Sequence, residues 1–199
     1  MVDATGPVVG PVPAGRDPVA YDRARRRILW SLPTGLYVVG TKAATSRNLM
    51  TISWVTQVAV EPKLVGIGVE SGSVTHQLLL DGRVFALSLL PRSERALVRR
   101  FAKPVVDAAV DESTGRGTMH GVSVWSATTG APVLDVALSW LDCELRHVVG
   151  LGSHSWFVGE VVDCGETEPA PSVPTADVPE PAGPPGVLRM EDTRMNYGG

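Results

Sequence analysis

Three hydroxyl side chains, Ser71, Ser73 and Thr75, alternate along a short polar stretch that follows an apolar, β-branched run. A helix is expected to begin within this stretch, at residue 73. The first N–H groups of a helix lack partners inside the helix and carry partial positive charge, so added hydroxyls make such a position suitable for a phosphate group. Ser and Thr are also common as ordinary helix caps. The pattern therefore predicts either a phosphate seat or a simple cap.

The sequence shows no clear pattern for nucleophilic or acid–base catalysis, for a metal site or for the dinucleotide-binding fold. No Ser-His-Asp arrangement or carboxylate pair points to a nucleophile or to acid–base catalysis. Cys143 and Cys164 form no C-x-x-C motif, so neither a disulfide framework nor a metal site is expected. The glycine-rich run at 66–72 does not match the dinucleotide-binding fingerprint, because its first two glycines lie inside an expected strand and no βαβ unit surrounds it.

Length and charge narrow the class of protein. The chain of 199 residues is 44% hydrophobic, which is enough for one sizeable core. Its formal net charge of −3 argues against a nucleic-acid or anionic-membrane surface, because such surfaces need clustered Lys and Arg. No signal peptide is evident, and no apolar run approaches the roughly 20 residues of a membrane span. We therefore expect a cytoplasmic protein.

Proline and glycine divide the chain into four parts. Residues 1–16 are expected to form a Pro/Gly-rich N-terminal arm, residues 17–163 the folded domain, residues 164–186 a Pro-rich linker, and residues 187–199 a tail that docks back on the domain. Within the domain, Asp17 followed by Pro18 predicts a helix start, because Asp caps helices and Pro suits the first helical position.

Changes of hydrophobic period predict mainly β structure with short helices. Expected strands are 36–41, 49–58, 64–69, 84–90, 122–125, 136–149 and 156–163. Expected helices are 17–32, 73–80 and 93–101, the second ending at Gly82 in the left-handed conformation, and 103–121 is expected to be irregular. Strands separated by turns favour an antiparallel barrel over parallel βαβ winding.

Several motifs together resemble one family. They are N-L-M-T-I-S-W, V-A-V-E-P-K-L-V-G-I-G-V, S-x-S-x-T-H, G-R-V-F-A-L-S-L-L and G-x-H-x-W-F-V-G-E-V, in this order. In combination they resemble the flavin reductase family of FMN-binding split barrels, which includes the NAD(P)H:flavin oxidoreductases of two-component monooxygenases. The resemblance covers roughly residues 20–163, and the ending D-T-R-M-N-Y-G-G is similar to endings in the same family.

The resemblance implies a homodimeric, six-stranded Greek-key split barrel that binds FMN, or alternatively FAD, near the subunit interface. NADH or NADPH would donate the hydride, and a flavin-dependent monooxygenase would be the partner. Hydride transfer between stacked rings needs no protein nucleophile. The family motifs place residues along the isoalloxazine and ribityl chain (Asn48, Leu49, Met50, Thr51, Ser53, Trp54), at the phosphate (Ser71, Ser73, Thr75, Lys103), elsewhere on the cofactor (Glu70, His76, Tyr197) and at the catalytic position (His154).

Alternatives remain for individual residues. Lys103 would also suit a helix end, His154 a structural role, Trp54 the core, and Tyr197 a packing anchor for the tail. The family's G-D-H motif reads G-S-H here, with Ser153 in place of the acid. That departure, together with the Pro-rich segment and returning tail, leaves a second hypothesis: a split-barrel protein that retains FMN as a carrier, sensor or partner subunit without free-flavin turnover.

Overall fold

The computed structural model describes residues 10–167 and 186–193, and it divides into two compact units: residues 1–33 with 194–199, and residues 34–193. In the first unit, helix α1 (Pro18–Trp30) begins as predicted, with Asp17 accepting a hydrogen bond of 2.8 Å from the N–H of Ala20. Helix α1 is grouped with the N-terminal residues rather than with the strands. No helix among the described residues is long and apolar enough to cross a membrane.

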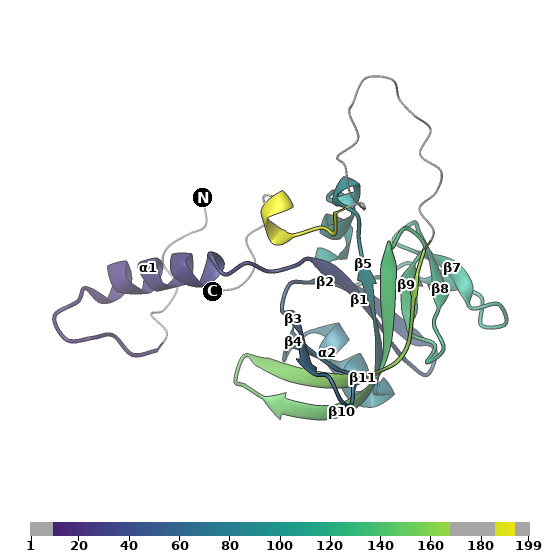
Figure 1. The fold of residues 1–199 in the computed structure, drawn as a ribbon, viewed down its shortest axis with the longest axis horizontal. Helices are drawn as coiled ribbons and strands as arrows, with labels where there is room; N and C mark the ends of the chain where they lie inside the picture. Colours follow the sequence, from purple (N-terminus) through teal and green to yellow (C-terminus); the bar gives the residue numbers. More distant parts are fainter. Residues whose placement is uncertain (1–9, 168–185, 194–199) are drawn as a thin grey trace, which may run out of the picture. The chain divides into compact units, whose positions relative to one another are not determined.

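The second unit is built on two antiparallel sheets (Figure 1). The larger has seven strands in the order β2-β1-β5-β10-β11-β4-β3: β1 (Tyr37–Ala43), β2 (Ser46–Ile52), β3 (Val55–Ala59), β4 (Leu64–Glu70), β5 (Val84–Leu89), β10 (Ser139–Gly150) and β11 (His154–Glu166). The smaller has the order β6-β7-β8-β9: β6 (Ala109–Val110), β7 (Arg116–Met119), β8 (Val122–Ser126) and β9 (Pro132–Leu134). Helix α2 spans Val74–Gly82, and 3-10 helices η1, η2 and η3 span Arg92–Glu94, Leu97–Ala102 and Met190–Asp192.

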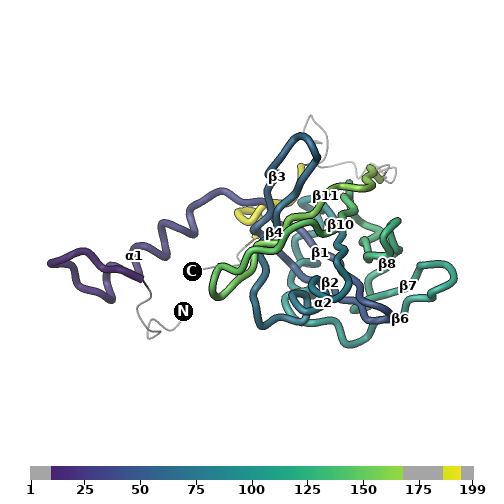
Figure 2. Tube along the Cα trace, turned by 90° about the horizontal axis from the view of Figure 1, so that it is seen from below, coloured from purple at the N-terminus to yellow at the C-terminus, as the bar shows by residue number. Residues whose placement is uncertain are grey.

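The strands form a barrel that the sheet hydrogen bonds do not close, which confirms the predicted mainly β, antiparallel split barrel. Among the described residues, one sheet has seven strands and a second sheet has four, whereas the resemblance implied a six-stranded barrel. The smaller sheet is fastened to the larger where the N–H of Leu134 donates to Ser88 Oγ at 3.1 Å. The β6–β7 hairpin extends outward from the smaller sheet (Figure 2).

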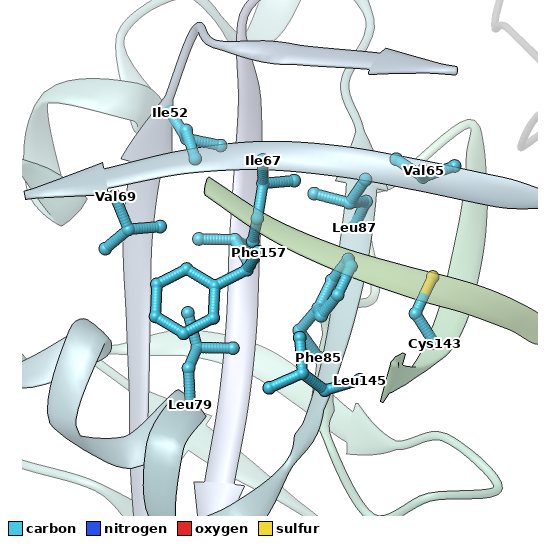
Figure 3. Close-up of a cluster of buried hydrophobic side chains, with 11 residues drawn as sticks. Ile52, Val65, Ile67, Val69, Leu79, Phe85, Leu87, Cys143, Leu145 and Phe157 are labelled. Carbon is cyan, nitrogen blue, oxygen red and sulfur yellow. The ribbon is translucent and has the colours of Figure 1, made fainter. Parts of the chain in front are cut away.

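The core lies on the inner face of the larger sheet and beneath α2. Eleven buried residues form it: Val39, Ile52, Val65, Ile67, Val69, Leu79, Phe85, Leu87, Cys143, Leu145 and Phe157. Leu79 of α2 points into this cluster beside Phe157 (Figure 3). Burying apolar side chains from six strands and one helix against each other is the dominant stabilising term for such a fold. It fixes the ends of β4 and α2 relative to β11.

Several predicted boundaries differ from the structure. The expected strand 49–58 is two strands, because the chain bends at residues 53–54 and Trp54 O accepts from the N–H of Gly68 on β4. The expected helix 93–101 consists of two 3-10 segments, η1 and η2. The expected irregular segment 103–121 contains β6 and β7. Hydrogen bonds to residues distant in the sequence decided these cases, and local propensity does not record them.

The predicted left-handed Gly82 is wrong. Gly82 is the last residue of α2, and Arg83 takes the left-handed conformation with φ +56°. Gly82 is required for another reason, since a Cβ built there would lie 1.7 Å from the carbonyl oxygen of Lys42 on β1. The helix end therefore rests directly on the strand backbone, and no larger residue fits there.

The C-terminal segment 186–193 runs across the ends of β1 and β5. Leu188 is fully buried, its N–H donates to Leu90 O at 2.8 Å, and its carbonyl accepts from the N–H of Leu36 at 3.1 Å. The N–H of Met190 donates to Thr34 O at 3.1 Å. β11 continues to Glu166, three residues into the segment predicted as a linker, and residues 168–185 of that segment lie outside the described residues.

Candidate functional site

The end of β4, the start of α2 and the β10–β11 turn meet at one place. Glu70 on β4 pairs in register with His154 on β11. Just beyond them, the N–H of Ser71 donates to Ser153 O at 3.0 Å, and Ser71 Oγ donates to Gly152 O at 3.3 Å. Residues some eighty positions apart in the sequence are therefore neighbours, which brings the predicted phosphate-binding hydroxyls to the predicted catalytic histidine.

The first turn of α2 leaves backbone donors free. Ser73 is the N-cap: its Oγ accepts from the N–H of His76 at 3.1 Å and donates to Glu70 O at 2.9 Å. Within the described residues, the N–H groups of Gly72, Val74 and Thr75 donate to no acceptor. The space beside Gly72 is open, since a Cβ there would meet no atom within 4 Å. Unpaired N–H groups at a helix start fit the phosphate of a flavin nucleotide.

The hydroxyl protons themselves are already engaged. Ser71 Oγ and Ser73 Oγ each donate to a backbone carbonyl, so neither has a second proton to give an anion in this arrangement. The expected donation from these two hydroxyls thus requires their rotation, whereas the backbone N–H groups need no change. At the turn that the sequence predicts for the phosphate, the groups available to an anion are therefore chiefly those of the main chain.

Thr75 and Asn48 form a buried link. Asn48 Nδ2 donates to Thr75 Oγ1 at 2.8 Å, and the N–H of Val105 donates to Asn48 Oδ1 at 2.8 Å. Asn48 is 2% exposed and Thr75 is 1% exposed. The single side-chain amide therefore ties β2, the first turn of α2 and the segment after η2 together. Both residues hold the site in shape from below its surface.

His154 and Trp54 form an aromatic pair at the same place. Their ring centroids lie 4.6 Å apart with the planes inclined at 46°. Ser153 Oγ lies 2.9 Å from His154 Nδ1, within hydrogen-bond distance, so Ser153 contacts the imidazole directly. His76 Nε2 lies 2.9 Å from Ser155 Oγ, and the His76 ring meets Phe157 edge-on at 5.1 Å.

The remaining predicted residues are dispersed. Leu49 is fully buried, Met50 is half-buried, Ser53 is buried, and Thr51 donates from Oγ1 to Val98 O at 2.5 Å. Glu70 and Lys103 are exposed, and Tyr197 lies outside the described residues. Both faces of β2 are covered, since Asn48 and Leu49 are both buried and so are Thr51 and Ile52.

Sequence reasoning missed two contacts. Ser155 holds His76, and Ser153 contacts His154, and neither was assigned a role from the sequence. Ser155 lies one residue before the expected strand 156–163, whereas β11 begins at His154, so the sequence alone gave no strand alternation from which to place the Ser155 side chain.

A charged cluster holds the β6–β7 turn onto the β1–β2 hairpin. Arg47 donates to both carboxylate oxygens of Glu112, and Lys42 Nζ lies 3.2 Å from Glu112 Oε2. The Arg47 hydrogen bonds, with those of Lys42 second, lower the pKa of Glu112 to about 2. No group of three or more His, Cys, Asp or Glu side chains among the described residues is placed to hold a metal ion.

The comparisons with known proteins agree with this geometry. A model described as the flavin reductase like domain matches residues 29–178, about three quarters of the chain. The chain belongs to the flavin reductase-like family. An NADH-dependent FAD reductase from Streptomyces globisporus is 31% identical over 157 residues, which cover 78% of this chain and 82% of that protein.

Two further proteins are similar to this chain. The styrene monooxygenase flavin reductase from Pseudomonas putida S12 has a similar structure, with a TM-score of 0.59, 25% identity, and coverage of 71% of this chain and 86% of that one. A protein of Nostoc sp. named diflavin flavoprotein A 1 is 29% identical over 140 residues, covering 70% of this chain and 23% of that protein. The chain thus spans about a quarter of the diflavin flavoprotein's length.

Proposed function

We propose that this flavin reductase-like chain is an NAD(P)H-dependent flavin reductase that binds FMN and supplies reduced flavin to a monooxygenase. One observation supports it above the rest: the unpaired N–H groups at the start of α2 and the His154–Trp54 pair both lie next to the C-terminal end of β4. An anion site near partly exposed aromatic rings suits a flat, phosphorylated cofactor. The relative from S. globisporus, an NADH-dependent FAD reductase by name, supports the activity and leaves FAD as the alternative flavin.

The proposed roles of the residues follow from their contacts. A bound flavin would supply the hydride-accepting chemistry. The first turn of α2 would bind the phosphate through its N–H groups, and the Asn48 link would keep that turn in place. Trp54 and His154 would lie against the flavin ring system, and Ser153 would hold the orientation of the His154 imidazole. The remaining proposed cofactor contacts are Leu49, Met50, Thr51, Ser53, Glu70, His76, Lys103 and Tyr197.

The proposed assembly is a homodimer in the cytoplasm. The edge strand β3 exposes Val58, and the β10–β11 hairpin exposes Val148, Val149 and Leu151. Such apolar surface on a sheet edge is typical of an interface with another chain. The name of the P. putida relative supports a monooxygenase as the recipient of reduced flavin.

Steady-state oxidation of NADH and NADPH in the presence of FMN, FAD or riboflavin tests the activity. We expect flavin-dependent loss of absorbance at 340 nm with at least one of the two donors. A purified, folded chain that oxidises neither donor with any of the three flavins would refute the enzyme assignment.

The substitution Ser73→Asp tests the position of the phosphate. Asp is as good an N-cap as Ser, so α2 should remain folded, while the added negative charge should repel a phosphate next to the helix start. We expect the Kd of FMN to rise by about tenfold or more, corresponding to about 1.4 kcal/mol, and the Kd of riboflavin, which has no phosphate, to change little. Equal weakening of both ligands would place the phosphate elsewhere.

The second candidate is a protein that retains FMN without releasing it. The observation that favours it is Ser153, which stands where the family motif has an acid and contacts His154 Nδ1. This candidate predicts FMN that stays bound through gel filtration and is not turned over by NADH. Rapid exchange of bound FMN for added riboflavin would count against it.

A further inference from the structure

We propose that a strip of four cations on and beside η1 and η2, namely Arg95, Arg99, Arg100 and Lys103, binds the diphosphate of an adenine dinucleotide. The two sources of that chemistry are FAD and NAD(P)H. The inference rests on the proposed function, and it adds a second anion site to the single phosphate seat at α2. We call these four residues the basic strip.

The charge of the basic strip is local and unbalanced. Residues 92–103 contain five Arg or Lys and one carboxylate, Glu94, in a chain whose formal net charge is −3. Arg92 is paired with Asp192 at 3.1 Å. The four cations of the strip are exposed, and no described residue forms an ion pair or hydrogen bond with any of them. Neighbouring like charges repel each other, so this arrangement favours an external anion.

The backbone beneath the strip is held in place. Leu97, Val98 and Phe101 are buried, which turns the intervening arginines outward. Val98 O accepts the hydrogen bond from Thr51 Oγ1 on β2. A fixed backbone with outward guanidinium groups is suited to phosphate, because the planar fork binds two oxygens at once.

The strip ends close to the phosphate seat. Asn48 contacts both Thr75 in the first turn of α2 and the N–H of Val105, at 2.8 Å each. Lys103 is extended, with φ −123° and ψ 154°, so its Cα lies at most about 7 Å from that of Val105. The phosphate-binding turn at the start of α2 and the basic strip are therefore neighbours, linked through Asn48. FMN has one phosphate, which the seat accommodates, whereas a dinucleotide has a diphosphate and an adenosine that extend further.

The test removes two charges of the strip and leaves the seat intact. The double variant Arg99→Gln/Arg100→Gln is compared with Arg116→Gln/Arg189→Gln, which loses the same charge at exposed positions outside the strip. Three quantities are measured: the Kd of FAD, the Kd of FMN, and the KM of NADH with FMN as the flavin. We expect the strip variant to raise the Kd of FAD or the KM of NADH at least about tenfold, which corresponds to the loss of one charge-assisted contact. The Kd of FMN should change less than about twofold in both variants, since it lacks the second phosphate.

The possible results distinguish FAD from NAD(P)H as the source of the diphosphate. They also distinguish failure of this proposal from failure of the proposed function. A rise confined to FAD identifies the flavin as the source of the diphosphate, and a rise confined to NADH identifies the reductant. Unchanged values for both, as expected if the strip contacts an acidic partner protein instead, would overturn the proposal. Should the wild-type chain bind no flavin, the proposed function fails, and calorimetry with ADP as the probe still decides on the strip: loss of ADP binding in the strip variant supports it, and no ADP binding to the wild type refutes it.

Discussion

The Asn48 amide should be the most consequential polar group below the site. Asn48→Ala deletes two hydrogen bonds of 2.8 Å, leaving the buried Thr75 hydroxyl and the partly buried N–H of Val105 without that partner. Each buried polar group left unsatisfied costs about 1–3 kcal/mol, so we expect a total loss of about 2–4 kcal/mol in the free energy of unfolding. For a chain of this size that corresponds to a fall in Tm of roughly 5–15 °C.

Urea-induced unfolding followed by tryptophan fluorescence measures the stability, and FMN titration measures the site. Thr75→Val is the matched variant, because it removes the hydroxyl and keeps the shape of the side chain. The double-mutant cycle between Asn48→Ala and Thr75→Val should give a coupling energy of about 0.5–3 kcal/mol, as residues in direct contact do. A free energy of unfolding within about 0.5 kcal/mol of the wild type in Asn48→Ala would refute the buried link.

Three further predictions concern other parts of the chain. Ser153→Ala should lower kcat for NADH-dependent FMN reduction about two- to tenfold, the equivalent of one hydrogen bond, with unchanged Tm; an unaltered kcat would show that the contact with His154 has no functional role. Because the pKa of Glu112 is depressed from 4.5 to about 2 by its hydrogen bonds, its stabilising contribution is complete above pH 4.5 and is lost as the pH falls through 2. Glu112→Gln should therefore lose less stability than the wild type between pH 4.5 and 2 in thermal unfolding, and parallel curves would contradict this. A thiol reagent should titrate Cys164 in the native chain and both cysteines only in denaturant, because burial raises the pKa of Cys143 to about 12; rapid native reaction of both thiols would contradict its burial.

The architecture was predictable because its signals are local. Alternating β-branched runs and turn residues gave the antiparallel strands, and Asp17-Pro18 gave the start of α1. The combination of motifs gave the family. The position of α2 followed from the Ser73 cap, which the structure places as expected.

The finer structure depended on contacts that the sequence does not display. Helical spacing in 93–101 predicted one α-helix, yet the segment follows β2 through the Thr51 hydrogen bond and becomes two 3-10 segments. Gly82 looked like a left-handed cap, and its actual constraint is the carbonyl of Lys42 on another element. The hydroxyls near α2 were recognised, but whether their protons were free depended on carbonyls eighty residues away or on the preceding turn. Such outcomes follow from tertiary packing rather than from propensity.

The burial of Leu188 has a consequence for how the polypeptide can be cut and rejoined. Gly186 O accepts a hydrogen bond from the N–H of Arg92, and the N–H of Thr167 donates to Leu138 O. The chain just before residue 168 and just after residue 185 is therefore hydrogen-bonded to the same unit, residues 34–193. A proteolytic nick between these two anchors breaks neither attachment, so the short C-terminal fragment should elute with the larger one until denaturant is added. Truncating the chain before residue 186 would remove the buried Leu188 and its two backbone hydrogen bonds to Leu90 and Leu36.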